Sequence, residues 1–162
     1  MGSGKTTVGK VLARKLGWRF VDTDRVIEKK EGRSIAAIFA TRGEKFFRTA
    51  ETRAIRAAVR SDRRVISVGG GAPCRKASRD AFAKKGFVVW LDASPDKILA
   101  RLRREPDGLR PLLSGPALSL RAVSDLLKKR RPHYRQAQLR VAVDRLTPSG
   151  AARRILRSIS AP

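Results

Sequence analysis

The chain has 162 residues, with 38 Lys and Arg against 14 Asp and Glu, so its formal net charge at pH 7 is +24. This length favours one domain, and the charge predicts attraction to anions of every kind without naming a partner. A single cysteine excludes an intrachain disulfide and suits a reducing compartment, and no apolar stretch approaches the roughly 20 residues of a membrane span or forms a signal-peptide core. We therefore expect a cytoplasmic protein.

Helices and strands are expected to alternate along the chain. A helix should follow GSGKTT (residues 2–7) and stop at Gly17, a short strand should cover WRFVDTD (18–24), and residues 25–61 should be helical with breaks at Gly32 and Gly43. Further strands are predicted in RVISVGGG (64–71), GFVVWLDASPD (86–96) and LRVAVD (139–144), with Phe87 and Trp90 in the core. Helices are expected to begin at residue 96, to cover residues 118–137, and to close the chain after Ser149, the expected N-cap. This alternation predicts an α/β domain with a parallel sheet.

GSGKTT predicts a phosphate-binding loop at the start of the first helix. Its glycines would let backbone N–H groups close around phosphate oxygens, and the positive end of the helix would face them. Lys5 would then reach the β- and γ-phosphates of ATP, while the hydroxyl of Thr6 would ligate Mg²⁺. A chance occurrence of these residues in a loop is the less favoured interpretation.

The usual first glycine of such a loop and the strand that precedes it are not in the sequence. We therefore expect a parallel sheet whose first, central strand is missing. We further expect that Met1 is an internal methionine of a longer protein, and that the chain as given is poorly stable and nearly inactive.

Three further groups of residues are candidates for a functional site. Asp22 and Asp24 end a predicted strand and could serve a metal and a hydroxyl, although a helix N-cap beside a solvated aspartate explains them equally well. Arg48 and Glu51, one helical turn apart, could be an ordinary surface ion pair. The run Gly69 to Gly71 is harder to dismiss, because glycines at a strand end usually allow a ligand to approach the backbone.

Taken together and in order, the motifs GSGKTT, DTD, SIAAIF, GEKFFR with Glu51, ISVGGGA, RPLL and KKRRPHY make the whole chain resemble the shikimate kinase family. The resemblance implies a single domain over residues 1–162, with the three-layer α/β fold of P-loop kinases, a mobile lid around residues 103–118 and a monomeric state. It also implies phosphorylation of the 3-hydroxyl of shikimate by ATP and Mg²⁺, a step towards chorismate and the aromatic amino acids.

The resemblance assigns a role to each candidate residue. Lys5, Asp24 and Arg110 would be catalytic, with Asp24 accepting the hydroxyl proton, and Thr6 and Asp22 would serve the metal. The expected nucleotide contacts are Gly2, Ser3, Gly4, Lys5, Thr6, Thr7, Arg103, Arg110 and Arg145. The expected shikimate contacts are Asp24, Arg48, Gly69, Gly70, Gly71 and Arg130. His133 and Tyr134 need be no more than packing residues.

Three other functions stay open at this point. A non-catalytic effector-binding module of the same fold is disfavoured because DTD and FFR are both intact. Another small-molecule P-loop kinase, such as a gluconate kinase, is disfavoured by the glycine run and by RPLL. For a nucleic-acid binder, only nonspecific attraction is expected.

Overall fold

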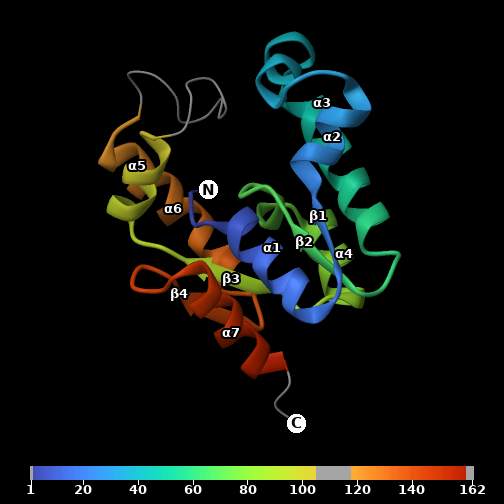
Figure 1. Cartoon of the computed structure of the whole chain (residues 1–162). Coiled ribbons are helices and arrows are strands. Elements are labelled where there is room, and N and C mark those ends of the chain that lie inside the picture. Colours follow the sequence, from blue (N-terminus) through green and yellow to red (C-terminus); the bar gives the residue numbers. More distant parts are fainter. Residues whose placement is uncertain (1, 105–117, 160–162) are drawn as a thin grey trace.

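The computed structural model of the chain describes residues 2–104 and 118–159, and within these ranges helices alternate with short strands (Figure 1). The helices are α1 (Lys5–Leu16), α2 (Thr23–Glu31), α3 (Ile35–Ala58), η1 (Ala72–Cys74, a 3₁₀ turn), α4 (Lys76–Lys85), α5 (Pro95–Leu102), α6 (Leu120–Tyr134) and α7 (Pro148–Ile159). The strands are β1 (Arg19–Asp22), β2 (Arg64–Ser67), β3 (Val89–Asp92) and β4 (Leu139–Ala142).

The four strands form two separate parallel pairs in the part of the chain that the structure describes. In the first pair β1 lies beside β2 with Asp22 opposite Ser67, and in the second β3 lies beside β4 with Asp92 opposite Ala142. The parallel α/β arrangement is as predicted, and so is the gap in the sheet. The two strands of each pair therefore end side by side, and the first pair ends just before the run Gly69 to Gly71.

The main hydrophobic core lies where helices cover the strands. Helices α1 and α7 pack against each other in front of the strands in Figure 1, and α6 lies behind them. The buried side chains of this core come from α1, α5, α6 and α7 and from the end of β4: Val8, Leu12, Ile98, Leu99, Leu102, Val123, Leu127, Val141, Val143 and Ile155. This packing fixes the direction in which the first turn of α1 points.

The expected helix boundaries are largely confirmed. Helix α1 ends at Gly17 with a left-handed backbone, α2 ends at Gly32 in the same way, and Gly43 interrupts α3 with φ 75° and ψ 171°. The predicted N-cap of the last helix is wrong. Ser149 lies inside α7, and the hydroxyl of Thr147 accepts the N–H of Gly150 instead, so the helix begins at Pro148.

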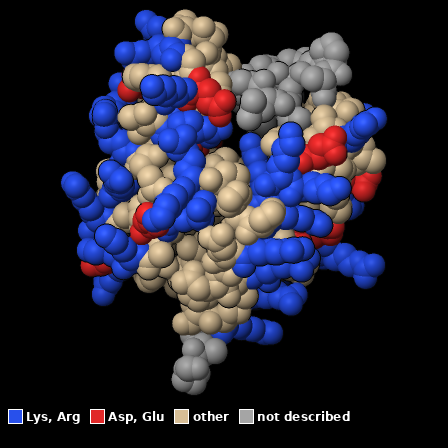
Figure 2. Space-filling model, turned by 180° about the vertical axis from the view of Figure 1, so that it is seen from behind, with Lys and Arg blue, Asp and Glu red and all other residues tan. Residues whose placement is uncertain are grey.

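Basic side chains cover much of the face of the molecule that is seen in Figure 2, and Asp and Glu form small isolated groups on it. Among the residues that the structure describes, no helix has the length and apolar character needed to cross a membrane. The charge distribution is thus that of a generally basic surface.

Candidate active site

The segment before α1 folds as a phosphate-binding loop. Gly4, the N-cap of α1, has φ 85°, a backbone conformation that residues with a Cβ rarely adopt. Gly2 also has a positive φ, and a Cβ there would lie 3.1 Å from Cγ2 of Ile98. These two glycines allow the chain to turn tightly into the helix, so the N–H groups of its first turn face the space in front of the loop.

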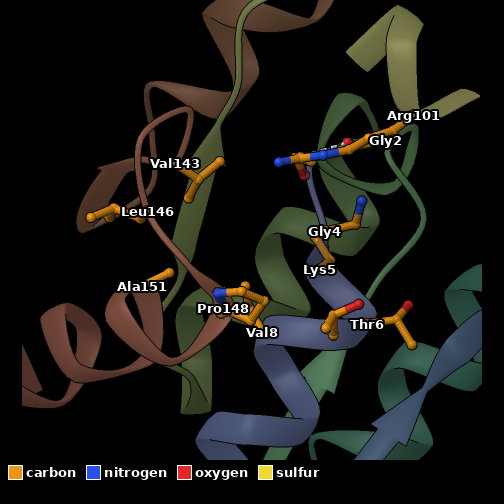
Figure 3. Close-up of a pocket in the computed structure, with 12 residues that line it drawn as sticks. Gly2, Gly4, Lys5, Thr6, Val8, Arg101, Val143, Leu146, Pro148 and Ala151 are labelled. Carbon is orange, nitrogen blue, oxygen red and sulfur yellow. Dashed lines mark hydrogen bonds between the residues drawn. The ribbon is translucent and has the colours of Figure 1, made fainter. Parts of the chain in front are cut away.

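A pocket of about 320 Å³ opens in front of this loop (Figure 3). One wall is the loop and the first turn of α1, and the other comes from the segment after β4 and the start of α7. The lining residues are Gly2, Ser3, Gly4, Lys5, Thr6, Thr7, Val8, Arg101, Val143, Leu146, Pro148 and Ala151. A pocket with an apolar wall opposite a ring of N–H groups and a lysine has the chemistry to hold a nucleotide, its base against the aliphatic side chains and its phosphates on the loop.

Arg101 on α5 is a pocket residue that the sequence analysis missed. Its Nη1 donates a hydrogen bond of 3.0 Å to the carbonyl oxygen of Gly2, the contact drawn as a dashed line in Figure 3. The expected nucleotide contacts Arg103 and Arg145 do not line the pocket. Arg103 is the C-cap of α5 and follows Arg101 by two residues. Residues at this spacing in a helix lie on different faces, so the two arginine side chains point in different directions. Arg110 and most of the expected lid lie outside the described residues.

Asp22 links the phosphate loop to the next helix. Its Oδ2 accepts a hydrogen bond of 3.0 Å from the Thr6 hydroxyl, and its Oδ1 accepts one of 3.1 Å from the N–H of Asp24. Asp22 is therefore the last residue of β1 and the N-cap of α2, which puts Asp24 in the first turn of the helix and not at a strand end. The N-cap role of Asp22 is confirmed, because its Oδ1 accepts from the N–H of Asp24, while its role at a metal stays a prediction that its contact with Thr6 supports. A hydroxyl beside a carboxylate is a donor set that suits Mg²⁺, which keeps most of its waters and needs few protein ligands.

Two carboxylates and a glycine backbone meet beyond Asp22. A Cβ at Gly69 would lie 2.6 Å from Oε1 of Glu51 and 3.2 Å from Oδ1 of Asp24, so both oxygens press against the glycine turn. Glu51 is fully buried, and its Oε1 has no hydrogen-bond partner among the residues that the structure describes. Burial raises the pKa of Glu51; Arg48 opposes this effect, and nearby Asp24 adds to it. A buried acceptor without a donor is costly, so this position suits a ligand that brings a hydroxyl group.

Arg48 stands beside these carboxylates with its guanidinium in a fixed place. Its Nη1 donates to Oε2 of Glu51 at 3.1 Å, and its Nε and Nη2 donate to Oε1 of Glu44 at 3.0 and 2.9 Å. A Cβ at Gly71 would lie 2.7 Å from Nη1, so only glycine leaves room for the guanidinium there. Burial alone would lower the pKa of Arg48, but Glu51 and Glu44 outweigh it and raise that pKa. Arg48 thus stays charged and oriented.

The glycine turn is also held from α6. The hydroxyl of Tyr134 donates a hydrogen bond of 2.7 Å to the carbonyl oxygen of Gly70, and Arg130 is buried one helical turn before Tyr134. Burial raises the pKa of Tyr134, so its hydroxyl keeps the proton that it donates. Tyr134 therefore does more than the packing role expected of it. The stretch RRPHY was a signal for this role, because it places Arg130 and Tyr134 on the same face of one helix.

Neighbouring contacts join several of the candidate residues to one another. They run from the loop through Thr6 and Asp22 to Asp24, and from there to the turn at Gly69, which contacts Glu51 and so leads to Arg48. Burial raises the pKa of the Cys74 thiol, and the positive charges of Arg130 and Arg48 oppose that rise. The arrangement joins a phosphate-binding loop to a polar site with two guanidinium groups and two carboxylates, which suits transfer of a phosphoryl group to an anionic alcohol.

Comparison with known proteins gives a consistent result. The family model described as shikimate kinase matches residues 1–160. A shikimate kinase of Symbiobacterium thermophilum is 47% identical over 146 residues, which are 90% of this chain and 83% of the relative. One from a Sulfurihydrogenibium species is 43% identical over 159 residues, 98% of this chain and 93% of the relative. The solved structure of the Acinetobacter baumannii shikimate kinase in complex with shikimate has a TM-score of 0.93 at 38% identity, covering 98% of this chain and 88% of that one.

Proposed function

Since this chain belongs to the shikimate kinase family, we propose that the site described above transfers the γ-phosphoryl group of ATP to the 3-hydroxyl of shikimate. The chain is a phosphotransferase of that family, and its fold is that of the P-loop kinases. The observation that best supports this assignment is the pair of hydrogen bonds made by Asp22. One joins it to Thr6 beside the phosphate loop, and the other joins it to the N–H of Asp24, the candidate proton acceptor.

The residues on the nucleotide side fit ATP and Mg²⁺. The N–H groups of the loop and Lys5 would hold the β- and γ-phosphates, and the hydroxyl of Thr6 and the carboxylate of Asp22, through water, would hold the metal. When bound, Mg²⁺ supplies positive charge that neutralises the phosphate oxygens. Lys5 contributes a second positive charge to the transferring group, and Arg110 is proposed to add a third from the lid.

The residues on the other side fit shikimate, which carries one carboxylate and three hydroxyls. Arg48 and Arg130 are proposed to bind the carboxylate, because a guanidinium offers two parallel donors where a lysine offers one point charge. Asp24 and the backbone of Gly69 to Gly71 are proposed to bind hydroxyls, and the open Oε1 of Glu51 accepts from another. Asp24 takes the proton that the acceptor hydroxyl releases as its oxygen forms the new bond to phosphorus and the bond to the β-phosphate oxygen breaks.

Several broader properties belong to the same proposal. The chain is proposed to work as a single domain and a monomer in the cytoplasm; most of the expected lid, residues 103–118, lies outside the described residues. Nucleic acid is attracted only through the general positive charge.

The test is release of ADP in the presence of Mg²⁺, with shikimate and, separately, gluconate as acceptors. We expect ADP release with shikimate only, and a phosphorus spectrum of the product that shows a monoester at the 3-position. ADP release with gluconate and none with shikimate would overturn the substrate assignment. A phosphate at another hydroxyl would overturn the proposed placement of shikimate against Asp24.

A further inference from the structure

The guanidinium of Arg48 is held by two carboxylates of very different character. Glu51 lies within the core, with its side chain 1% exposed, whereas the side chain of Glu44 is 56% exposed. Glu44 nevertheless makes the fuller contact, because one of its oxygens accepts from both Nε and Nη2 of Arg48 at 3.0 and 2.9 Å. The two donors that form the natural fork for an incoming carboxylate are therefore taken by a surface residue.

We propose that Glu44 is a built-in competitor for the carboxylate of the substrate: it occupies the fork of Arg48 in the empty site and is displaced when shikimate binds. The proposal rests on the proposed role of Arg48 in binding that carboxylate. Glu44 then sets the affinity for shikimate and the selectivity against other anions. The hydrogen bond between Glu51 and Arg48 is kept in both the empty and the occupied site.

The orientation of Arg48 does not depend on Glu44. Its Nη1 remains bonded to the buried Glu51, and its guanidinium lies against the backbone of Gly71 on one side. The centre of the guanidinium also lies 5.2 Å from the centroid of the Phe47 ring. These contacts hold the plane of the group after Glu44 leaves, and the exposed Glu44 side chain can turn into water at little cost.

A competitor of this kind is useful on a strongly basic protein. With a net charge of +24, the surface concentrates small anions of every kind near the site. A small anion that contacts only the fork of Arg48 gains little by replacing Glu44, since it exchanges one anionic partner for another. Shikimate gains more, because its hydroxyls also reach the oxygens of Asp24 and Glu51 beside Gly69.

The size of the effect follows from population arithmetic. An ion pair one helical turn apart with one exposed partner is worth up to about 1 kcal/mol. The apparent affinity of a ligand that binds only the open form is reduced by the fraction of open molecules. For pairs of this strength the open fraction is roughly one in two to one in six, so removal of Glu44 should strengthen shikimate binding about two- to sixfold.

The experiment is calorimetric titration of the full chain and its variants with shikimate, with the methyl ester of shikimate and with ATP. In Glu44→Gln and Glu44→Ala we expect the dissociation constant for shikimate to fall about two- to sixfold, while those for the ester and for ATP stay unchanged, because neither presents that carboxylate to Arg48. The control is Asp80→Asn, which removes an exposed i,i+4 ion pair, Lys76–Asp80, on α4, a helix that carries no candidate residue of the site. It should leave all three constants unchanged.

Two results would overturn the proposal and are distinguishable from each other. Weaker or unchanged shikimate binding in both Glu44 variants, with Arg48→Lys still selectively impaired for shikimate, would make Glu44 a positioning residue and not a competitor. Equal binding of shikimate by Arg48→Lys and the unaltered chain would instead show that Arg48 does not bind the carboxylate, and the role of Glu44 would fall with it.

Discussion

Replacing Gly69 with alanine tests the close approach of two carboxylates to the glycine turn. The added methyl would lie 2.6 Å from Oε1 of Glu51 and 3.2 Å from Oδ1 of Asp24, both shorter than ordinary contact distances. Glu51 has nowhere to move, because it is fully buried and its other oxygen is bonded to Arg48. Asp24 is also tied at its backbone N–H to Asp22.

Overpacking of this kind costs about 1–3 kcal/mol. If that cost falls on the arrangement of Asp24 and Glu51 that binds the acceptor, the dissociation constant for shikimate rises about five- to 150-fold, since 1.4 kcal/mol corresponds to a factor of ten. ATP contacts neither carboxylate in the proposed arrangement, so its affinity should change little.

The assay is titration of Gly69→Ala with shikimate and with ATP, together with thermal unfolding. Gly86→Ala is the control, because its new Cβ would also be crowded, at 3.1 Å from the carbonyl oxygen of Phe82, but Gly86 lies between α4 and β3, neither of which carries a candidate residue of the site. The pair Gly69→Ala and Glu51→Asp should be less than additive, since the shorter carboxylate makes room for the methyl. Wild-type affinity for shikimate in Gly69→Ala would refute the reasoning.

Three further predictions concern single side chains of the site. Arg48→Lys should weaken shikimate binding by about 1.5–3 kcal/mol for each charged hydrogen bond lost, with ATP binding unchanged; Arg42→Lys, which alters a comparable pair with Glu31, should change neither affinity, and an equal loss of both ligands in Arg48→Lys would indicate a folding defect. Asp24→Asn should lower kcat by about 10²-fold or more with a small change in KM, because an amide still bonds a hydroxyl but cannot take its proton; steady-state kinetics with an unchanged kcat would remove Asp24 from this role. Burial raises the pKa of Glu51 above its ordinary 4.5, so the folded chain holds that proton more tightly than the unfolded chain, and its contribution to stability should fall as the pH rises from about 4.5 through the raised pKa. Urea unfolding between pH 4 and 8 should show this slope in the unaltered chain and lose it in Glu51→Gln; equal slopes in the two proteins would contradict the assignment.

Local signals in the sequence predicted most of the helices and strands. Gly17 and Gly43 correctly indicated a helix end and a helix break. Both have a positive φ, which glycine adopts readily, so the residue type alone was sufficient for the prediction. The segment from Ala72 to Lys85 was not anticipated as a 3₁₀ turn and a helix, since no cap or apolar period marks its start. Phe87 was expected in the core and is 50% exposed, because it precedes β3 and so lies outside the pairing with β4.

The candidate site could be predicted only where a motif carried it. Lys5 and Thr6 follow from the loop pattern, but the bond from Arg101 to Gly2 joins residues 99 positions apart, and that from Tyr134 to Gly70 joins residues 64 apart. Contacts at such separations depend on how helices α5 and α6 pack on the strands, which no local pattern specifies. The pairing of Glu44 with Arg48 is local and could be expected from their spacing. Its proposed role depends on the burial of Glu51, the other carboxylate bonded to Arg48, which the sequence does not show.

The two oxygens of Asp22 serve two different neighbours, one holding the Thr6 hydroxyl and the other the first turn of α2. In the proposed arrangement, a cation that draws on this carboxylate would alter the cap of the helix that carries Asp24, so binding at the phosphate loop would change the proposed site of the acceptor alcohol. Thermodynamic linkage then requires symmetry: by whatever factor the metal–nucleotide complex strengthens the hold on shikimate, shikimate strengthens the hold on that complex by the same factor. Through Asp22, the binding of either substrate would thereby change the affinity for the other.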